Sequence, residues 1–166
     1  MNLRPLTGLM LGLALLATPA LAHDYKLGSL EIEHPWSRAT PPTAPSAGGF
    51  LKIVNKGTTA DRLVSVKSTA SAKTEIHEMK MEGSVMRMRE LDKGLEIPAG
   101  GSVTLAPGGY HLMFMQLKEP FKQDAKVPVT LVFEKAGSID VELNVVAMGA
   151  TPAGVTPPSG GHQQHK

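Results

Sequence analysis

A succession of short apolar runs, separated by turn residues, fills the chain from residue 27 to residue 148 and limits the possible folds more than any other feature. Several runs alternate apolar and polar residues, as a strand with one buried face does, and none keeps the 3.6-residue repeat of an amphipathic helix. Such runs, at spacings of about 8–12 residues, predict an all-β fold of about nine antiparallel strands, as a sandwich or barrel. The candidate strands cover residues 30–36, 50–54, 63–66, 76–81, 85–91, 103–105, 110–117, 127–133 and 139–146.

Residues 1–22 have the pattern of a secretory signal peptide. Arg4 supplies a positive charge, an apolar run of 11 residues begins at Leu6, and Ala20-Leu21-Ala22 matches the small-x-small cleavage pattern. The apolar run is shorter than the roughly 20 residues of a membrane-spanning helix. We therefore expect the signal peptide to be removed and the mature protein to be secreted and soluble.

The remainder of the chain divides into one domain, residues 23–149, and a tail, residues 150–166. The tail is rich in Pro, Gly, Gln and His, and it cannot bury enough apolar surface to offset its ordering entropy, so it is predicted to be disordered. Without cysteine the chain cannot form disulfides, thiolate zinc sites, Fe–S clusters or a blue-copper centre. Its 17 basic and 15 acidic residues are too balanced for a nucleic-acid binder.

Methionine and histidine gather in one part of the chain. Of the nine methionines, two precede residue 23 and six of the other seven lie between residues 79 and 115, with His77 and His111 at the edges of that window. Alternate residues of a strand share a face. The sets that share a face are His77, Met79 and Met81; Met86 and Met88; and His111, Met113 and Met115.

Strand parity indicates where these sets point. If Leu112 and Phe114 face the core, the set that begins with His111 faces outward or toward a rim. The short Glu82-Gly83-Ser84 segment predicts a hairpin between the first two sets. A single methionine is more often a core filler than a ligand. Several thioethers and imidazoles on faces opposite an apolar face are instead a reason to expect a bound ion.

Ligand chemistry selects the ion. Thioethers are soft, neutral donors that favour Cu(I), and imidazole also suits copper. Zinc sites normally add thiolate or carboxylate, and calcium and magnesium require oxygen ligands. We therefore expect Cu(I) binding by two histidines and two methionines.

The residues resemble the periplasmic copper chaperone family PCu(A)C over roughly residues 32–148. The strongest stretches are 77–89, 94–101 and 107–115. The family's motif is His, ten residues, Met, about twenty-one residues, then His-x-Met. His77 and Met88 match the first spacing and His111-Leu112-Met113 the end, but twenty-two residues separate Met88 from His111. We expect the extra residue in the turn around residues 91–94, where it leaves both strands in register.

The resemblance implies a cupredoxin-like, broadly immunoglobulin-like, β-sandwich that binds Cu(I) through His77, Met88, His111 and Met113. It further implies a periplasmic, monomeric chaperone that delivers copper to the binuclear centre of cytochrome c oxidase, alongside a thioredoxin-like Sco partner. Met79, Met81, Met86 and Met115 are candidate auxiliary ligands, and they would matter most in the alternative of a copper storage or resistance protein.

Three further interpretations stay open. His162 and His165 of the tail could hold Cu(II), or they could be incidental residues of a solvated tail. An enzyme is not expected, since the sequence has no nucleophile elbow and no His-Glu-x-x-His motif. The remaining enzymatic alternative is a copper oxygenase that uses His23 as a mature N-terminal ligand. An immunoglobulin-like adhesion module with incidental methionines is the structural alternative.

Overall fold

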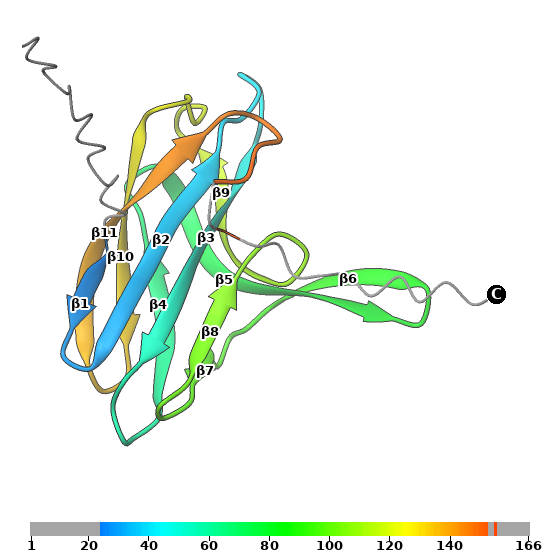
Figure 1. The fold of residues 1–166 in the computed structure, drawn as a ribbon. Helices are drawn as coiled ribbons and strands as arrows, with labels where there is room; N and C mark the ends of the chain where they lie inside the picture. Colours follow the sequence, from blue (N-terminus) through cyan, green and yellow to red (C-terminus); the bar gives the residue numbers. More distant parts are fainter. Residues whose placement is uncertain (1–23, 153–154, 156–166) are drawn as a thin grey trace, which may run out of the picture.

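The computed structural model describes residues 24–152 and residue 155, and these residues are all-β, with no helix among them. The predicted fold class is confirmed, with eleven strands instead of about nine (Figure 1). Within the described part of the chain, no helix is long and apolar enough to cross a membrane. The strands are β1 Tyr25–Leu27, β2 Leu30–Arg38, β3 Ser46–Asn55, β4 Asp61–Lys67, β5 Ser71–Glu82, β6 Val85–Glu90, β7 Leu95–Ile97, β8 Ser102–Leu105, β9 Tyr110–Leu117, β10 Lys126–Phe133 and β11 Gly137–Val146.

Two details differ from the sequence-based expectation. The additional strands, β1 and β7, have three residues each, too few for a recognisable alternation. One strand pair is parallel: β11 lies beside β2 with Asn144 opposite Trp36, whereas the other pairs between described strands are antiparallel. Alternation reveals which residues share a face but carries no information on the direction of a neighbouring strand.

The strands form a continuous hydrogen-bonded sheet in the order β6-β5-β9-β3-β2-β11-β10-β4-β7, with β1 beside β2 and β8 beside β3. The sheet folds back on itself, since β4 and β5 contact each other although they are far apart in that order. The core between the two layers is built from alternate residues of each strand. Its fully buried members include Leu51, Ile53, Leu112, Phe114 and Leu131.

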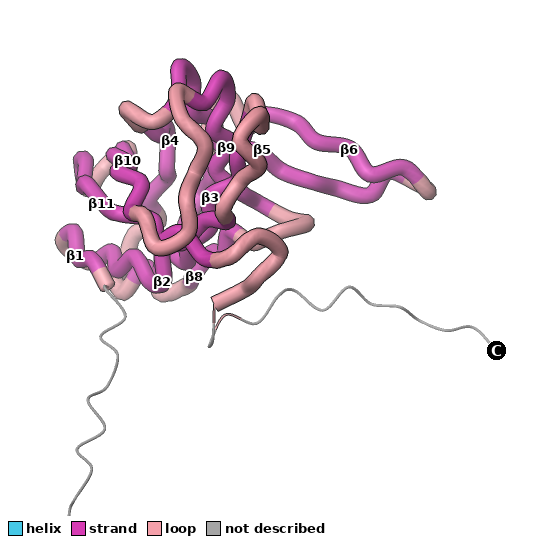
Figure 2. Tube along the Cα trace, turned by 90° about the horizontal axis from the view of Figure 1, so that it is seen from above, coloured by secondary structure: helices cyan, strands magenta, loops and turns pink. Residues whose placement is uncertain are grey.

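The β5–β6 hairpin extends beyond the sandwich. Only Gly83 and Ser84 separate the two strands, which confirms the predicted hairpin. β9 pairs with β5 only as far as Glu78, so the last residues of β5 have β6 as their strand partner. As a result, the outer part of the hairpin projects from the body as an arm (Figures 1 and 2). All side chains of β6 are exposed.

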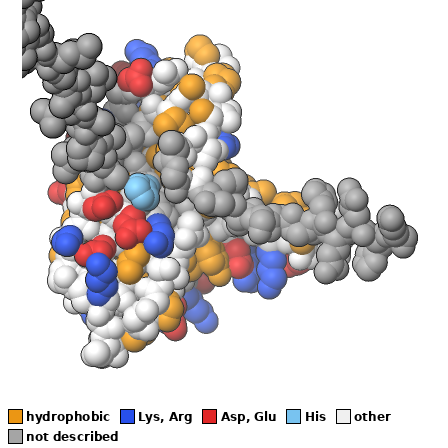
Figure 3. Space-filling model, in the orientation of Figure 1, with side chains coloured by type: hydrophobic (Ala, Val, Ile, Leu, Met, Phe, Trp, Pro, Cys, Tyr) orange, Lys and Arg blue, Asp and Glu red, His pale blue; other side chains and the backbone are white. Residues whose placement is uncertain are grey.

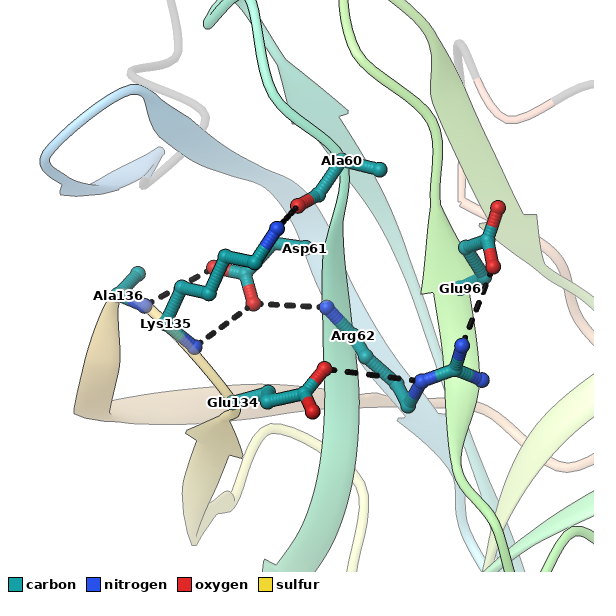
Figure 4. A network of polar contacts seen from close by, with 7 residues as sticks. All are labelled: Ala60, Asp61, Arg62, Glu96, Glu134, Lys135 and Ala136. Atoms are coloured by element: carbon teal, nitrogen blue, oxygen red, sulfur yellow. Dashed lines mark hydrogen bonds and ion pairs between the residues drawn. The ribbon is translucent and has the colours of Figure 1, made fainter.

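The buried carboxylate of Asp61 fastens the first residue of β4 to the turn between β10 and β11 (Figure 4). It accepts hydrogen bonds from the backbone N–H groups of Arg62, Lys135 and Ala136 at 2.7–2.9 Å. Burial by itself would raise the pKa of Asp61, but the three donors together hold that pKa below its ordinary value. The carboxylate is therefore ionised at neutral pH, and its contribution to stability is lost only in strong acid.

We expect Asp61→Ala to lower the free energy of unfolding by on the order of 3 kcal/mol, because three backbone donors lose their acceptor at about 1 kcal/mol each. Urea denaturation followed by circular dichroism measures the change. Asp92→Ala, at an exposed turn position, is the matched control and is expected to leave the denaturation midpoint unchanged. Equal midpoints for the two variants would contradict a fastening role for Asp61.

Candidate metal centre

Two histidines from adjacent strands lie side by side on the sheet face opposite the core residues Leu112 and Phe114. His77 of β5 is directly opposite His111 of β9, with ring centroids 5.7 Å apart and ring planes inclined by 65°. The side chain of His77 is 11% exposed, and His111 is 5% exposed. Because imidazole nitrogens bind metal ions at about 2 Å, this separation leaves room for one ion between the two rings.

The hydrogen bond of His111 determines which of its nitrogens can bind a metal. Nδ1 lies 3.0 Å from the carbonyl oxygen of Gly109, and since a carbonyl only accepts, Nδ1 carries the proton. In the neutral ring, Nε2 is then the nitrogen with a free lone pair. Burial lowers the pKa of His111, an effect that the Gly109 bond opposes and the nearby His77 reinforces. The ring is therefore neutral at physiological pH, as a metal ligand must be.

Glu75 contacts Nε2 of His77, whereas in His111 the hydrogen-bonded nitrogen is Nδ1. Oε2 of Glu75 lies 2.7 Å from Nε2 of His77. The ion pair with Lys73, followed by the bond to His77, holds the pKa of Glu75 below its ordinary value against the effect of burial. The ionised carboxylate can only accept, so Nε2 of His77 carries a proton, and in the neutral form of the ring Nδ1 holds the lone pair. That Nδ1 is buried and has no hydrogen-bond partner.

Glu75 was not among the candidate residues from the sequence, although its parity could have indicated it. It precedes His77 by two residues and so shares its strand face. A carboxylate behind a metal-binding histidine is a common arrangement that orients the ring and makes the ligand nitrogen more basic. The carboxylate of Glu75 is not a soft ligand, so the residue does not belong to the methionine and histidine pattern.

The burial of His111 is a second point at which the structure differs from the sequence-based expectation. The residue lies on the face opposite Leu112 and Phe114, as parity predicts, yet it is buried rather than outward at a rim. It is flanked by β5 on one side and β3 on the other. On the β3 side Gly48 lies opposite Met113, and the Phe50 ring covers this glycine at 2.9 Å from the position of a Cβ. The Phe50 ring therefore lies over the β3 backbone at the rung of Met113.

Strand register places the predicted methionine ligands on the same face as the histidines. Met113 follows His111 by two residues and lies opposite Glu75. Met88 of β6 lies opposite Met79, two rungs from the one that pairs His77 with Glu90 and therefore on the same face. The turn at residues 91–94 lies between β6 and β7, outside both strands. His77, Met88, His111 and Met113 thus occupy one face of three neighbouring strands.

The candidate auxiliary methionines follow the same register. Met81 lies opposite Met86 toward the tip of the hairpin, and Met115 lies opposite Lys73 near the other end of β9. His23, His162 and His165 lie outside the described residues. Arg38 contacts Ala150 and Thr151, so the first residues of the predicted tail lie against the domain.

Within the described part of the chain, the histidine pair has no third His, Asp or Glu that would complete a metal site. Among residues 24–152 and 155, no three His, Asp or Glu side chains come together closely enough to hold a metal ion. A zinc or calcium site built from such groups is therefore absent from this part of the chain. The same strand face also carries the thioethers of Met88 and Met113, and thioethers bind soft monovalent ions.

Comparison with known proteins gives one family and one group of structures. The family model described as "Putative lipoprotein LpqE-like" matches residues 30–145. A curated relative, "Putative lipoprotein Lxx21020" of Leifsonia xyli subsp. xyli (strain CTCB07), is 32% identical over 116 residues, which are 70% of this chain and 69% of the relative.

The similar solved structures are PCuAC domains. The "Copper-bound PCuAC domain from PmoF2" is 30% identical with a TM-score of 0.64, and the match covers 75% of this chain and 98% of that domain. The "Apo PCuAC domain from PmoF1" is 31% identical with a TM-score of 0.65, over 75% of this chain and 99% of that domain. The matches are thus to metal-binding domains and not to enzymes, in agreement with the sequence-based expectation.

Proposed function

This chain belongs to the LpqE-like family and has the fold of PCuAC domains, and on that premise we propose that it is an extracytoplasmic copper chaperone. Its cargo is one Cu(I) ion, held by Nδ1 of His77, Nε2 of His111 and the thioethers of Met88 and Met113. The observation that carries the proposal is the buried histidine pair, because each ring has one nitrogen fixed by a hydrogen bond and the other available.

The charge of the site favours a monovalent cargo. Two imidazoles and two thioethers are all neutral, so they do not offset the charge of a divalent ion, while their softness suits Cu(I). Glu75 lies behind His77 and supplies one negative charge, part of which its ion pair with Lys73 neutralises. The ion is thereby bound without a thiolate, which suits release to an acceptor that has thiolates.

The proposed route follows from the resemblance. Residues 1–22 direct the chain to the periplasm and are removed, and the monomeric chaperone passes Cu(I) to the binuclear centre of cytochrome c oxidase, with a Sco-type protein as co-worker. Storage of several copper ions is the alternative. Delivery requires one tight site and transfer to a dithiol acceptor, whereas storage requires several sites of similar affinity.

Anaerobic Cu(I) titration in competition with a chelator tests the proposal. We expect one tight equivalent, with X-ray absorption that shows both nitrogen and sulfur ligands, and loss of the ion to a dithiol peptide. A spectrum with oxygen and nitrogen ligands alone, or several equivalents of equal affinity, would rule out the proposed site.

Glu75→Gln is expected to lower the Cu(I) affinity about 10–100-fold, the usual cost of changing a residue that orients a metal ligand. The variant removes the charge that fixes the proton on Nε2 of His77. Chelator competition measures the affinity, and ¹⁵N NMR of the histidine rings reports the tautomer, which a merely structural role would leave unchanged.

Glu78→Gln is the matched control for Glu75→Gln. Glu78 lies on the same strand but on the opposite face, where it pairs with Arg89. Its substitution is expected to leave both affinity and tautomer as in the wild type. Equal losses of Cu(I) affinity in the two variants would mean that the total negative charge on β5, and not the contact of Glu75 with His77, determines the affinity.

A further inference from the structure

Four methionines form two adjacent rungs on one face of the projecting β5–β6 hairpin, and we call them the methionine ladder. Met79 lies opposite Met88, and Met81 lies opposite Met86. The backbone bond from Leu91 N to Ile76 O marks the hydrogen-bonded positions of this strand pair. By alternation, both methionine rungs fall at non-hydrogen-bonded positions, where facing side chains come closest.

The ladder faces solvent. Met81, Met86 and Met88 are 47–52% exposed, although methionine is usually a buried residue. The rungs of the opposite face carry charges: Lys80 lies opposite Arg87, and Glu78 lies opposite Arg89. The arm therefore has one thioether face and one charged face, and Figure 3 shows hydrophobic and charged side chains along it.

The donors of the ladder select a particular class of ion. Thioethers carry no charge and no proton at any ordinary pH, and they bind soft monovalent metals while they discriminate against hard or divalent ones. The nearest carboxylate on the same face is that of Glu90, on the rung of His77. The tip of the ladder, Met79, Met81 and Met86, therefore offers three neutral sulfurs and no hard ligand of its own.

We propose that Met79, Met81 and Met86 form a second, weaker site for a soft monovalent ion at the tip of the hairpin. This inference deepens the proposed function and rests on it for the identity of the ion as Cu(I). Met88, a ligand of the first site, adjoins the second, since it lies diagonal to His77 on one side and two residues from Met86 on the other. An ion taken up at the exposed tip then reaches the buried histidines by exchange between sulfurs.

Titration with Ag(I), a redox-stable soft ion, tests the second site in the purified protein with ¹³C-labelled methionine methyl groups. The first equivalent is expected to shift the resonances of Met88 and Met113. The second, weaker equivalent is expected to shift those of Met79, Met81 and Met86. If the second equivalent leaves the Met81 and Met86 resonances unmoved, the exposed ladder is a protein-docking face or an unused surface, and the inference is overturned.

Two sets of variants separate this inference from the proposed function. Met81→Leu with Met86→Leu keeps the apolar bulk and is expected to abolish the second step while the first is unchanged. Met148→Leu changes another exposed methionine, which lies after the end of β11 and outside the hairpin, and is expected to change neither step. His77→Ala with His111→Ala should remove the first step and keep the ladder step. A second step that survives in the Met81/Met86 variant overturns the ladder site, and a first step that survives in the histidine variant overturns the proposed function.

Discussion

Replacement of His111 by alanine is expected to lower the Cu(I) affinity by more than about 100-fold, and His77→Ala should have an effect of the same size. A substitution of a residue that only orients a metal ligand lowers the metal affinity about 10–100-fold. Loss of the ligand itself is therefore expected to lower it further. The two variants should behave alike because each ring contributes one nitrogen to the same ion. Anaerobic competition against a Cu(I) chelator measures both affinities.

The control for these variants is His34→Asn. Among the described histidines, His34 lies apart from the pair, on β2, and it is exposed. Its φ of 48° is a conformation that asparagine tolerates, so the substitution is expected to leave fold and affinity unchanged. Since His111 is buried, its variant also needs a far-ultraviolet circular dichroism spectrum that matches the wild type. Wild-type affinity in either folded histidine variant would exclude that ring from the site.

Features that depend on residues close together in the sequence could be predicted, and features that depend on the pairing of strands far apart in the sequence could not. The faces of β9 were predictable, because alternation around Leu112 and Phe114 is local to the strand. The pairing of β5 with β6 was predictable too, because a connection as short as Gly83-Ser84 fixes the register. The strand pairing that puts His77 opposite His111 did not follow from alternation, because β6, β7 and β8 intervene between β5 and β9 in the sequence; only the family resemblance implied that the two histidines share a site.

The sequence indicated soft ligands for the candidate site but not the groups that hold the histidine rings. The clustering of methionines around two histidines singled out one face of three strands, and the strand register places these residues on a common face. The Gly109 carbonyl, which fixes the proton of the His111 ring, has no signature of its own in a sequence, whereas Glu75 could have been found from its parity with His77. A hydrogen bond from a ring to a backbone oxygen depends on geometry that residue types do not encode.

Acid is expected to weaken Cu(I) binding, because each ligand ring must be neutral to bind the ion. A ring of ordinary pKa is half-protonated near pH 6.5. Burial, reinforced by the nearby His77, moves the pKa of His111 below that value, so protons compete for its Nε2 only in more acidic solution. The affinity should therefore be constant above neutral pH and should decline in the acidic range.

Where both rings are protonated in the free protein, the affinity is expected to fall by up to about 100-fold per pH unit, because each ion then displaces two protons. In His111→Ala the limiting fall is about tenfold per unit, since one displaced proton remains. Chelator competition from neutral pH to about pH 4, a range that includes the ordinary histidine pKa of about 6.5, measures both slopes. Thioethers take up no proton in this range, so a site of methionines alone would give a flat profile. A flat wild-type profile would therefore contradict histidine ligation, while equal slopes in the two proteins would show that His111 does not bind the ion.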